Sequence, residues 1–349
     1  MHTLQPHRSL NIVAFSLSLI NHLPHDFFWR VQFAQIPSSP SSDSSSWSLD
    51  LPWQTPHRDT VQDFRLALAQ IRPALGDLKH NLALHLDYVE RAAAEAANVV
   101  VFPEQSLTGY FLSDLVATVA LRRDDPRLDP LRAASTNIDI VFGFVEETID
   151  HRFLPAAAYL HAGEFVHIHH KVYLVTYGLF DEARDLASGS SIRAFDSPLG
   201  RQAMLICEDL WHPSAASIVA ADGADVIYGL SSSPGRGVSD GSSELGSAKT
   251  WRRLNQLYAQ LHVCYVAHCN RVGFEDGVNF WGGSEIVGPD GTVLARAPDF
   301  KEALVVATLR DAELRRQRAR LPLRRDENVG INGREFARIA AQRHRANDD

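Results

Sequence analysis

The sequence predicts an α/β fold of mixed sheets that are covered by helices. Short uncharged apolar runs recur along the chain, as expected for buried strands. Segments with apolar residues at helical spacing lie between several of these runs, and turn motifs such as Pro289-Asp290-Gly291 join others as hairpins. If two such sheets pack face to face, the architecture is a four-layer α-β-β-α sandwich.

The predicted elements begin near residue 64. A first strand at 64–71 is followed by a turn in which Asp77 caps a helix at 78–97. Further strands are predicted at 99–102, 138–145, 156–160, 203–206, 226–230, 263–268, 284–287 and 303–308. Two more helices are predicted at 213–222 and 246–261.

The chain divides by composition into three parts. A folded domain is predicted at 61–328, between an extension at 1–60 and a C-terminal tail at 329–349. Serine and proline concentrate at 37–46 and cannot supply a packed core, so 1–60 is predicted to be a disordered linker. The uncharged stretch at 10–20 is too short to span a membrane, and its polar residues disfavour a signal peptide.

Bulk composition limits the classes of partner. With 45% hydrophobic and 22% charged residues, the chain is typical of a globular protein. A formal net charge of −8 argues against nucleic acid or an anionic membrane as partner. The three cysteines, Cys207, Cys264 and Cys269, are too few for a disulfide framework. A reducing, cytoplasmic location is therefore expected, where a free thiol persists.

Three polar residues stand at the ends of apolar runs. Cys207 follows 203–206, Glu104 follows 99–103, and Lys171 lies beside Val172. Because open α/β sheets build their sites at strand ends, these residues suggest one catalytic centre. A thiol with a pKa of about 8.5 is mostly protonated near neutrality, so it needs a carboxylate to take its proton. A lysine held between carboxylates stays charged and can stabilise an oxyanion.

The residues around these positions resemble the signature blocks of the nitrilase superfamily of carbon–nitrogen hydrolases. The blocks are Phe102-Pro103-Glu104-Gln105-Ser106-Leu107-Thr108-Gly109-Tyr110, His170-Lys171-Val172-Tyr173-Leu174 and Leu205-Ile206-Cys207-Glu208-Asp209. The resemblance covers about 64–328. Segments 173–182 and 207–211 are also similar to the glutaminase domain of glutamine-dependent NAD synthetases. No Ser-Gly-Gly-x-Asp-Ser pyrophosphate loop occurs in the sequence, so this chain is not expected to make NAD by itself.

The resemblance implies the four-layer fold and a Glu-Lys-Cys triad. Glu104 would be the general base, Cys207 the nucleophile, and Lys171 with the backbone N–H of Glu208 the oxyanion site. Glu182 matches the second glutamate that holds the lysine in this family. The implied reaction is hydrolysis of a small linear amide to acid and ammonia through a thioester, with no cofactor and no metal. A homodimer or a larger homo-oligomer is also implied.

The substrate contacts implied by the resemblance are Tyr110, Tyr177 and Ser233. The sequence departs from the family pattern nearby. Val175 replaces an expected proline, and Asp185-Leu186 replaces an expected aromatic pair. A basic residue expected a few positions after Ser233-Pro234 is not clearly placed, since Ser239 lies near that position and Arg236 lies earlier. The acyl group of the substrate therefore stays open.

Several alternatives remain. The same triad would serve a nitrile or N-carbamoyl hydrolase, or a glutaminase subunit that supplies ammonia to a separate synthetase partner. A catalytically dead scaffold is disfavoured, because all three triad positions are intact. His212 is the best competing base, while Cys264 and Cys269 are predicted to be core residues. Three further histidines have a strand spacing that could bind zinc, but a surface or sheet-edge position is favoured: His167, His169 and His170.

Overall fold

The computed structural model describes residues 63–237 and 245–348, and the predicted extension at 1–60 lies outside them. The strands are β1 (Phe64–Gln70), β2 (Val99–Val101), β3 (Asp139–Glu147), β4 (Phe153–His161), β5 (Glu164–His170), β6 (Ala194–Ser197), β7 (Gly200–Ile206), β8 (Val226–Ser231), β9 (Tyr265–Asn270), β10 (Val272–Glu275), β11 (Val278–Trp281), β12 (Glu285–Val287), β13 (Val293–Arg296) and β14 (Ala303–Leu309). The α-helices are α1 (Leu78–Ala94), α2 (Val116–Val119), α3 (Asp129–Ala134), α4 (Pro213–Ala221), α5 (Gly246–His262), α6 (Asp311–Arg320), α7 (Leu323–Asp326) and α8 (Val329–Asp348). Short 3-10 turns are η1 (Ser113–Leu115), η2 (Pro126–Leu128), η3 (Glu182–Arg184) and η4 (Cys207–Trp211).

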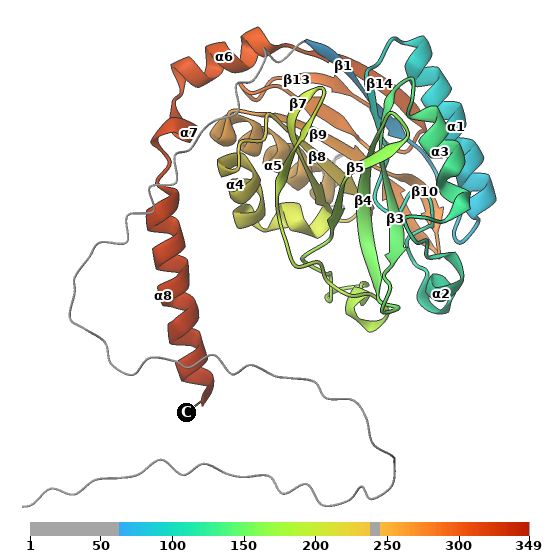
Figure 1. Ribbon diagram of the computed structural model, residues 1–349, viewed down its shortest axis with the longest axis horizontal. Coiled ribbons are helices and arrows are strands. Elements are labelled where there is room, and N and C mark those ends of the chain that lie inside the picture. The colour runs from blue at the N-terminus through green and yellow to red at the C-terminus, as the bar shows by residue number, and fades with distance from the viewer. Residues whose placement is uncertain (1–62, 238–244, 349) are drawn as a thin grey trace, which may run out of the picture. The chain divides into compact units, whose positions relative to one another are not determined.

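Two six-stranded mixed sheets form the centre of the domain (Figure 1). The first has the order β14-β1-β2-β3-β4-β5, and the second has the order β13-β12-β9-β8-β7-β6. In each sheet three neighbouring strands run parallel, and antiparallel strands complete both sides. The hairpin β10–β11 is separate from both sheets.

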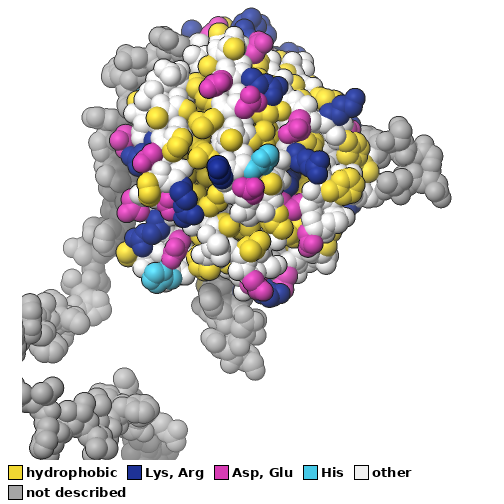
Figure 2. Space-filling model, turned by 90° about the vertical axis from the view of Figure 1, so that its right-hand side faces the viewer, with side chains coloured by type: hydrophobic (Ala, Val, Ile, Leu, Met, Phe, Trp, Pro, Cys, Tyr) yellow, Lys and Arg dark blue, Asp and Glu magenta, His cyan; other side chains and the backbone are white. Residues whose placement is uncertain are grey.

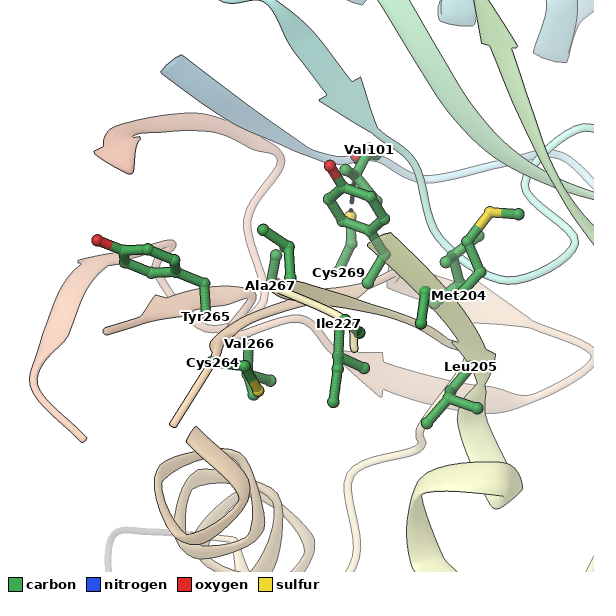
Figure 3. Packing of buried hydrophobic residues seen from close by; sticks show 14 of the residues in the cluster. Val101, Met204, Leu205, Ile227, Cys264, Tyr265, Val266, Ala267 and Cys269 are labelled. Atoms are coloured by element: carbon green, nitrogen blue, oxygen red, sulfur yellow. Dashed lines mark hydrogen bonds between the residues drawn. The ribbon is translucent and has the colours of Figure 1, made fainter. Parts of the chain in front are cut away.

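The two sheets pack face to face, and their inner faces share one hydrophobic cluster (Figure 3). The ring centroids of Tyr159 on β4 and Tyr228 on β8 lie 6.4 Å apart. The Cys269 Sγ atom of β9 lies 3.2 Å from the backbone oxygen of Val101 on β2. Cys269 and Cys264 are both fully buried, so the prediction that they are core residues is confirmed.

Helices cover the outer face of each sheet, which completes the predicted four-layer α-β-β-α sandwich (Figure 1). Helix α1 buries Tyr88 and Val89 against the first sheet. Helix α5 buries Trp251 and Ala259 against the second sheet. On the side that carries α1 and α3, charged side chains of both signs are scattered between apolar ones (Figure 2).

The structure contains elements that the sequence did not predict, namely the short helices α2 and α3, strands β5 and β6, the β10–β11 hairpin and the helices after β14. Strand β5 reads Glu-Phe-Val-His-Ile-His-His and is only partly buried, so it lacks the apolar run of a central strand. Helix α8 lies within the predicted tail at 329–349. None of the helices in the described residues is long and apolar enough to cross a membrane.

Candidate active site

Lys171 is the centre of a buried cluster of charged groups. It directly follows β5, and its side chain is fully buried. Its Nζ atom donates to Glu104 Oε1 and to Glu182 Oε1, each at 2.7 Å. The structure therefore brings together three predicted site residues, and it excludes a solvated position for Lys171.

Glu104 enters this cluster through a tight turn after β2. Its second oxygen, Oε2, accepts a hydrogen bond from the backbone N–H of Ser232 at 2.8 Å, just beyond β8 of the other sheet. The next residue, Gln105, has a left-handed φ of 47°. The turn packs so closely on β3 that a Cβ atom at Gly143 would lie 2.3 Å from Gln105 N. Glycine at position 143 is thus required for this position of Glu104.

The electrostatics of the cluster follow from its burial. Burial raises the pKa of Glu104 to about 7, even though the Lys171 ammonium lowers it and Glu182 raises it further. Burial alone would lower the pKa of Lys171, but Glu104 and Glu182 together raise it well above its ordinary value. Lys171 is therefore a permanent cation, while Glu104 can exchange a proton near neutrality.

Cys207 follows β7 on the second sheet, with a left-handed φ of 44° that is unusual for a residue with a side chain. Its side chain is buried, and burial together with the charge of Glu104 raises the pKa of the thiol well above its ordinary value. Lys171 and a hydrogen bond from the backbone of Ser232 oppose this rise. The thiol is consequently protonated at rest, and it requires a base in order to react.

Glu182 is fixed by several donors besides Lys171. The hydroxyl of Tyr110 donates to Oε1 at 2.7 Å, and the backbone N–H of Val175 donates to Oε2 at 2.9 Å. The prediction placed Tyr110 at the substrate, and the structure places its hydroxyl on Glu182. Val175, which departs from the family pattern, is buried and keeps a backbone N–H that proline would lack.

A second buried ion pair, which the sequence gave no sign of, supports Tyr110. Glu275 of β10 accepts the backbone N–H groups of Tyr110 and Phe111, both at 2.8 Å. Arg271 donates to the other oxygen of Glu275 at 2.6 Å, and both side chains are almost fully buried. Glu275 is 165 residues from Tyr110 in sequence, so no local motif connects the two.

The other predicted substrate contacts lie at varied depths. Tyr177 is 57% exposed, and its hydroxyl donates to the two carboxylate oxygens of Glu208 at 3.1 and 3.0 Å. Burial raises the pKa of Glu208. Ser233 is buried, and its Oγ accepts a hydrogen bond from Trp251 Nε1 at 2.8 Å. The Arg236 guanidinium lies 5.1 Å from the ring centroid of Phe180.

A cavity of about 300 Å³ borders this cluster on the side of Tyr110 and Glu182. Phe111, Phe180 and Leu186 form part of its apolar lining. Cys207 does not line this cavity, so the cavity is an adjoining space rather than the position of a reacting carbonyl.

The histidines occupy different environments from one another. Strand β5 ends the first sheet in the described residues, which confirms the edge position of His167, His169 and His170. A surface position is wrong for His169, which is 2% exposed and bonded to Asp209 Oδ2 at 2.8 Å. His212 is partly exposed and stacks on Tyr173 at 3.6 Å between ring centroids. Within the described ranges, no cluster of three or more His, Cys, Asp or Glu side chains could hold a metal ion.

Known proteins resemble this chain over most of its described length. A glutamine-dependent NAD(+) synthetase of Acinetobacter baylyi is 29% identical over 70% of this chain and 44% of its own length. A chloroplastic omega-amidase of Arabidopsis thaliana is 27% identical over 75% of this chain and 72% of its own length. This chain spans about half the length of the NAD(+) synthetases that it matches: the match covers 44%, 42% and 47% of three of them.

Solved structures of a glutamine-dependent NAD+ synthetase and of an amidase also resemble this chain. The glutamine-dependent NAD+ synthetase of Acinetobacter baumannii superposes with a TM-score of 0.64 at 29% identity, covering 72% of this chain and 47% of that one. An amidase of Nesterenkonia sp. superposes with a TM-score of 0.63 at 26% identity, covering 76% of this chain and 96% of that one. The family model for carbon-nitrogen hydrolases matches residues 65–319, well over half of the 349 residues. The chain therefore belongs to the carbon–nitrogen hydrolase family and is an enzyme that acts on C–N bonds.

Proposed function

We propose that the protein hydrolyses a small linear amide to an acid and ammonia through a thioester on Cys207. The observation that carries the proposal is the buried Lys171 ammonium, held at 2.7 Å by both Glu104 and Glu182. This arrangement supplies one fixed cation and one carboxylate with a pKa of about 7 beside a neutral thiol. These are the groups that acyl transfer to sulfur requires.

The first half-reaction forms the thioester. Glu104 in its carboxylate form takes the proton of Cys207 as the sulfur attacks the amide carbonyl. The oxyanion that develops is stabilised by the Lys171 ammonium and by the backbone N–H of Glu208. Glu104 then passes its proton to the departing nitrogen, so the C–N bond breaks and ammonia leaves.

The second half-reaction repeats these roles with water. Glu104, once more a carboxylate, takes a proton from a water molecule that attacks the thioester carbonyl. The tetrahedral intermediate collapses with cleavage of the C–S bond, and the proton on Glu104 returns to the sulfur. Because Lys171 stays charged in both halves, it acts as an electrostatic group and not as a base.

The test is a substrate panel with a direct readout of the intermediate. Purified protein is incubated with amides, nitriles and ureido acids, ammonia is assayed, and intact mass is used to find an adduct on Cys207. Cys207→Ala is the control, and it is expected to abolish both signals. Ammonia release that survives Cys207→Ala, or no turnover across the panel, would count against the proposal.

The chemistry near Tyr177 favours an ammonia-supplying glutaminase as the second candidate. Glu208 can accept from a ligand ammonium, and Arg236 beside Phe180 can pair with a ligand carboxylate. An α-amino acid amide such as glutamine carries both groups. The match to about half of several glutamine-dependent NAD(+) synthetases supports the same candidate. Faster turnover of glutamine than of propionamide, together with co-purification of a synthetase partner, would favour it. Rapid turnover of nitriles or ureido acids would instead favour a nitrile or N-carbamoyl hydrolase.

The remaining expectations concern assembly and location. We propose a homodimer or larger homo-oligomer in a reducing cytoplasm, where the Cys207 thiol is preserved. The proposed chemistry needs no cofactor and no metal, and the net charge of −8 disfavours nucleic acid and membranes as partners. Light scattering of the full chain gives the assembly size.

A further inference from the structure

The carboxylate of Asp209 joins the two segments that carry Cys207 and Lys171. Its Oδ2 atom accepts from the backbone N–H of Ile206 at 3.0 Å and from His169 Nε2 at 2.8 Å. Its Oδ1 atom accepts from the backbone N–H groups of Val172 and Tyr173, both at 3.0 Å. One side chain therefore receives four hydrogen bonds, from β7 of the second sheet, from β5 of the first sheet and from the loop that follows β5.

Two of these donors are direct neighbours of triad residues in the chain. Ile206 immediately precedes Cys207, and Val172 immediately follows Lys171. Asp209 is fully buried, with a relative exposure of 0%, so these donors take the place of solvent around its carboxylate. Burial would raise its pKa, but the bonds from His169 and from the backbone outweigh burial and lower it, so the side chain is a carboxylate.

His169 extends this connection into β5. It is itself 2% exposed, and it lies two residues before Lys171 on the strand that the lysine follows. A buried Nε2–H group that donates to Asp209 fixes the carboxylate plane, and so decides which oxygen faces each segment. Within the described residues, neither side chain forms a hydrogen bond with Glu104 or Glu182.

We propose that Asp209, oriented by His169, is a positioning residue that sets the distance and angle between the Cys207 thiol and the Lys171 ammonium. The proposal rests on the function proposed above, in which Cys207 attacks the carbonyl group whose oxyanion Lys171 stabilises. Asp209 also holds the turn in which Cys207 adopts its left-handed φ of 44°, a conformation that needs support from its surroundings.

The variant Asp209→Asn tests this with little change of shape. An amide side chain keeps one acceptor oxygen and presents an NH2 group where the second oxygen stood, so the Ile206 N–H faces a donor. We expect kcat to fall roughly hundred-fold, as small misplacements of reacting groups do, while KM changes less than about three-fold.

The matched control is Asp139→Asn. Asp139 is also a buried carboxylate bonded to a histidine, since it accepts from Tyr159 at 2.5 Å and pairs with His161 at 2.6 Å. Within the described residues its side chain forms no hydrogen bond with the triad. We expect Asp139→Asn to lower thermal stability and to leave kcat unchanged. Equal losses of kcat in the two variants, or kcat of Asp209→Asn within three-fold of wild type, would overturn the proposal.

A second pair of variants works even if Asp209→Asn does not fold. His169→Gln retains a side-chain N–H donor and is expected to keep kcat within about five-fold, whereas His169→Phe keeps the ring and loses the donor. We expect His169→Phe to lower kcat at least ten-fold further, and equal activity of the two would contradict the assigned role.

The rate of iodoacetamide labelling at Cys207 separates failure of this proposal from failure of the proposed function. It needs no amide substrate, and peptide mass distinguishes label on Cys207 from label on Cys264 or Cys269, all three of which are free and buried. We expect Asp209→Asn to label Cys207 about ten-fold more slowly than wild type, since the thiol loses its alignment with Glu104 and Lys171. Unchanged labelling in Asp209→Asn would refute positioning, whatever the substrate proves to be.

Discussion

At the scale of single residues, the site depends on one lysine that neutralises only part of the charge around it. Lys171 contacts two carboxylates, so the cluster is anionic when both are ionised. In a buried site this excess charge is relieved by protonation, and burial raises the pKa of Glu104 to about 7. A glutamate exposed on the surface would lose its proton at a pH far below 7 and would be a weak base.

The first prediction is a pH profile set by Glu104. The carboxylate form is the base, so kcat/KM is expected to rise with pH, reach half of its plateau near pH 7, and stay level above it. Measuring kcat/KM between pH 5 and pH 9, with fluorescence at each pH to confirm that the protein stays folded, tests this. A flat profile across this range would contradict the role of Glu104.

The second prediction ranks two candidate bases. Glu104→Gln removes the proton acceptor and is expected to lower kcat by at least a thousand-fold. His212→Ala is expected to keep kcat within about five-fold, because His212 stacks on Tyr173 and is 42% exposed. Steady-state ammonia release from both variants is the measurement, and the reverse ranking would make His212 the base.

At the scale of elements, close approach of strands and turns determines where Glu104 stands. Strand β3 supports the turn after β2, and that turn has space only because residue 143 lacks a side chain. Hairpin β10–β11 also supports the cluster, since its Glu275 accepts the backbone N–H of Tyr110, and the Tyr110 hydroxyl donates to Glu182. The charged cluster is thus positioned by two elements that contribute no triad residue.

The third prediction concerns Gly143. The Cβ of Gly143→Ala would lie 2.3 Å from Gln105 N and 2.5 Å from Pro103 O, so the turn must shift. We expect a loss of about 1–3 kcal/mol in the free energy of unfolding and a fall in kcat of roughly hundred-fold. Urea unfolding and steady-state kinetics measure the two effects. Gly333→Ala in helix α8, where a Cβ meets nothing within 4 Å, is the control. It is expected to leave kcat unchanged and not to lower the free energy of unfolding, since alanine favours a helix over glycine.

The fourth prediction concerns the buried pair of Glu275 and Arg271. Glu275→Gln leaves the Arg271 guanidinium buried without its counter-charge, which costs about 3–5 kcal/mol of folding free energy. Asp299→Asn breaks the more exposed pair with Arg252 and is expected to cost less than about 1 kcal/mol. Chemical unfolding of both variants makes the comparison, and equal costs would show that burial of the Glu275 pair does not matter.

At the scale of the whole domain, the sequence predicted the parts whose signal is local. Strands β2 and β7 are buried on both faces and therefore have continuous apolar runs. The ends of these runs indicated the positions of Glu104 and Cys207. The edge strand β5 has no such run, so Lys171 was indicated only by the short apolar stretch that begins at Val172 and by the resemblance around it. The role of Glu275 could not be found, because the backbone N–H groups that it accepts, those of Tyr110 and Phe111, lie more than 160 residues away and depend on the packing of the fold.

The same long-range assembly gives the last prediction. Glu104 and Lys171 come from the first sheet, whereas Cys207 and the Ser232 N–H come from the second, so the site exists only while the sheets are packed together. Met204 is fully buried in the cluster shared by the two sheets, and Met204→Ala is expected to cost about 2–5 kcal/mol. Because no triad residue is altered, activity and tryptophan fluorescence should be lost together in urea, with both midpoints lowered by the same amount. Phe336→Ala on α8, where the side chain is 64% exposed, should leave both midpoints unchanged. Activity that persisted after the fluorescence transition would mean that one sheet can hold the site alone, and that would contradict an active centre built from both.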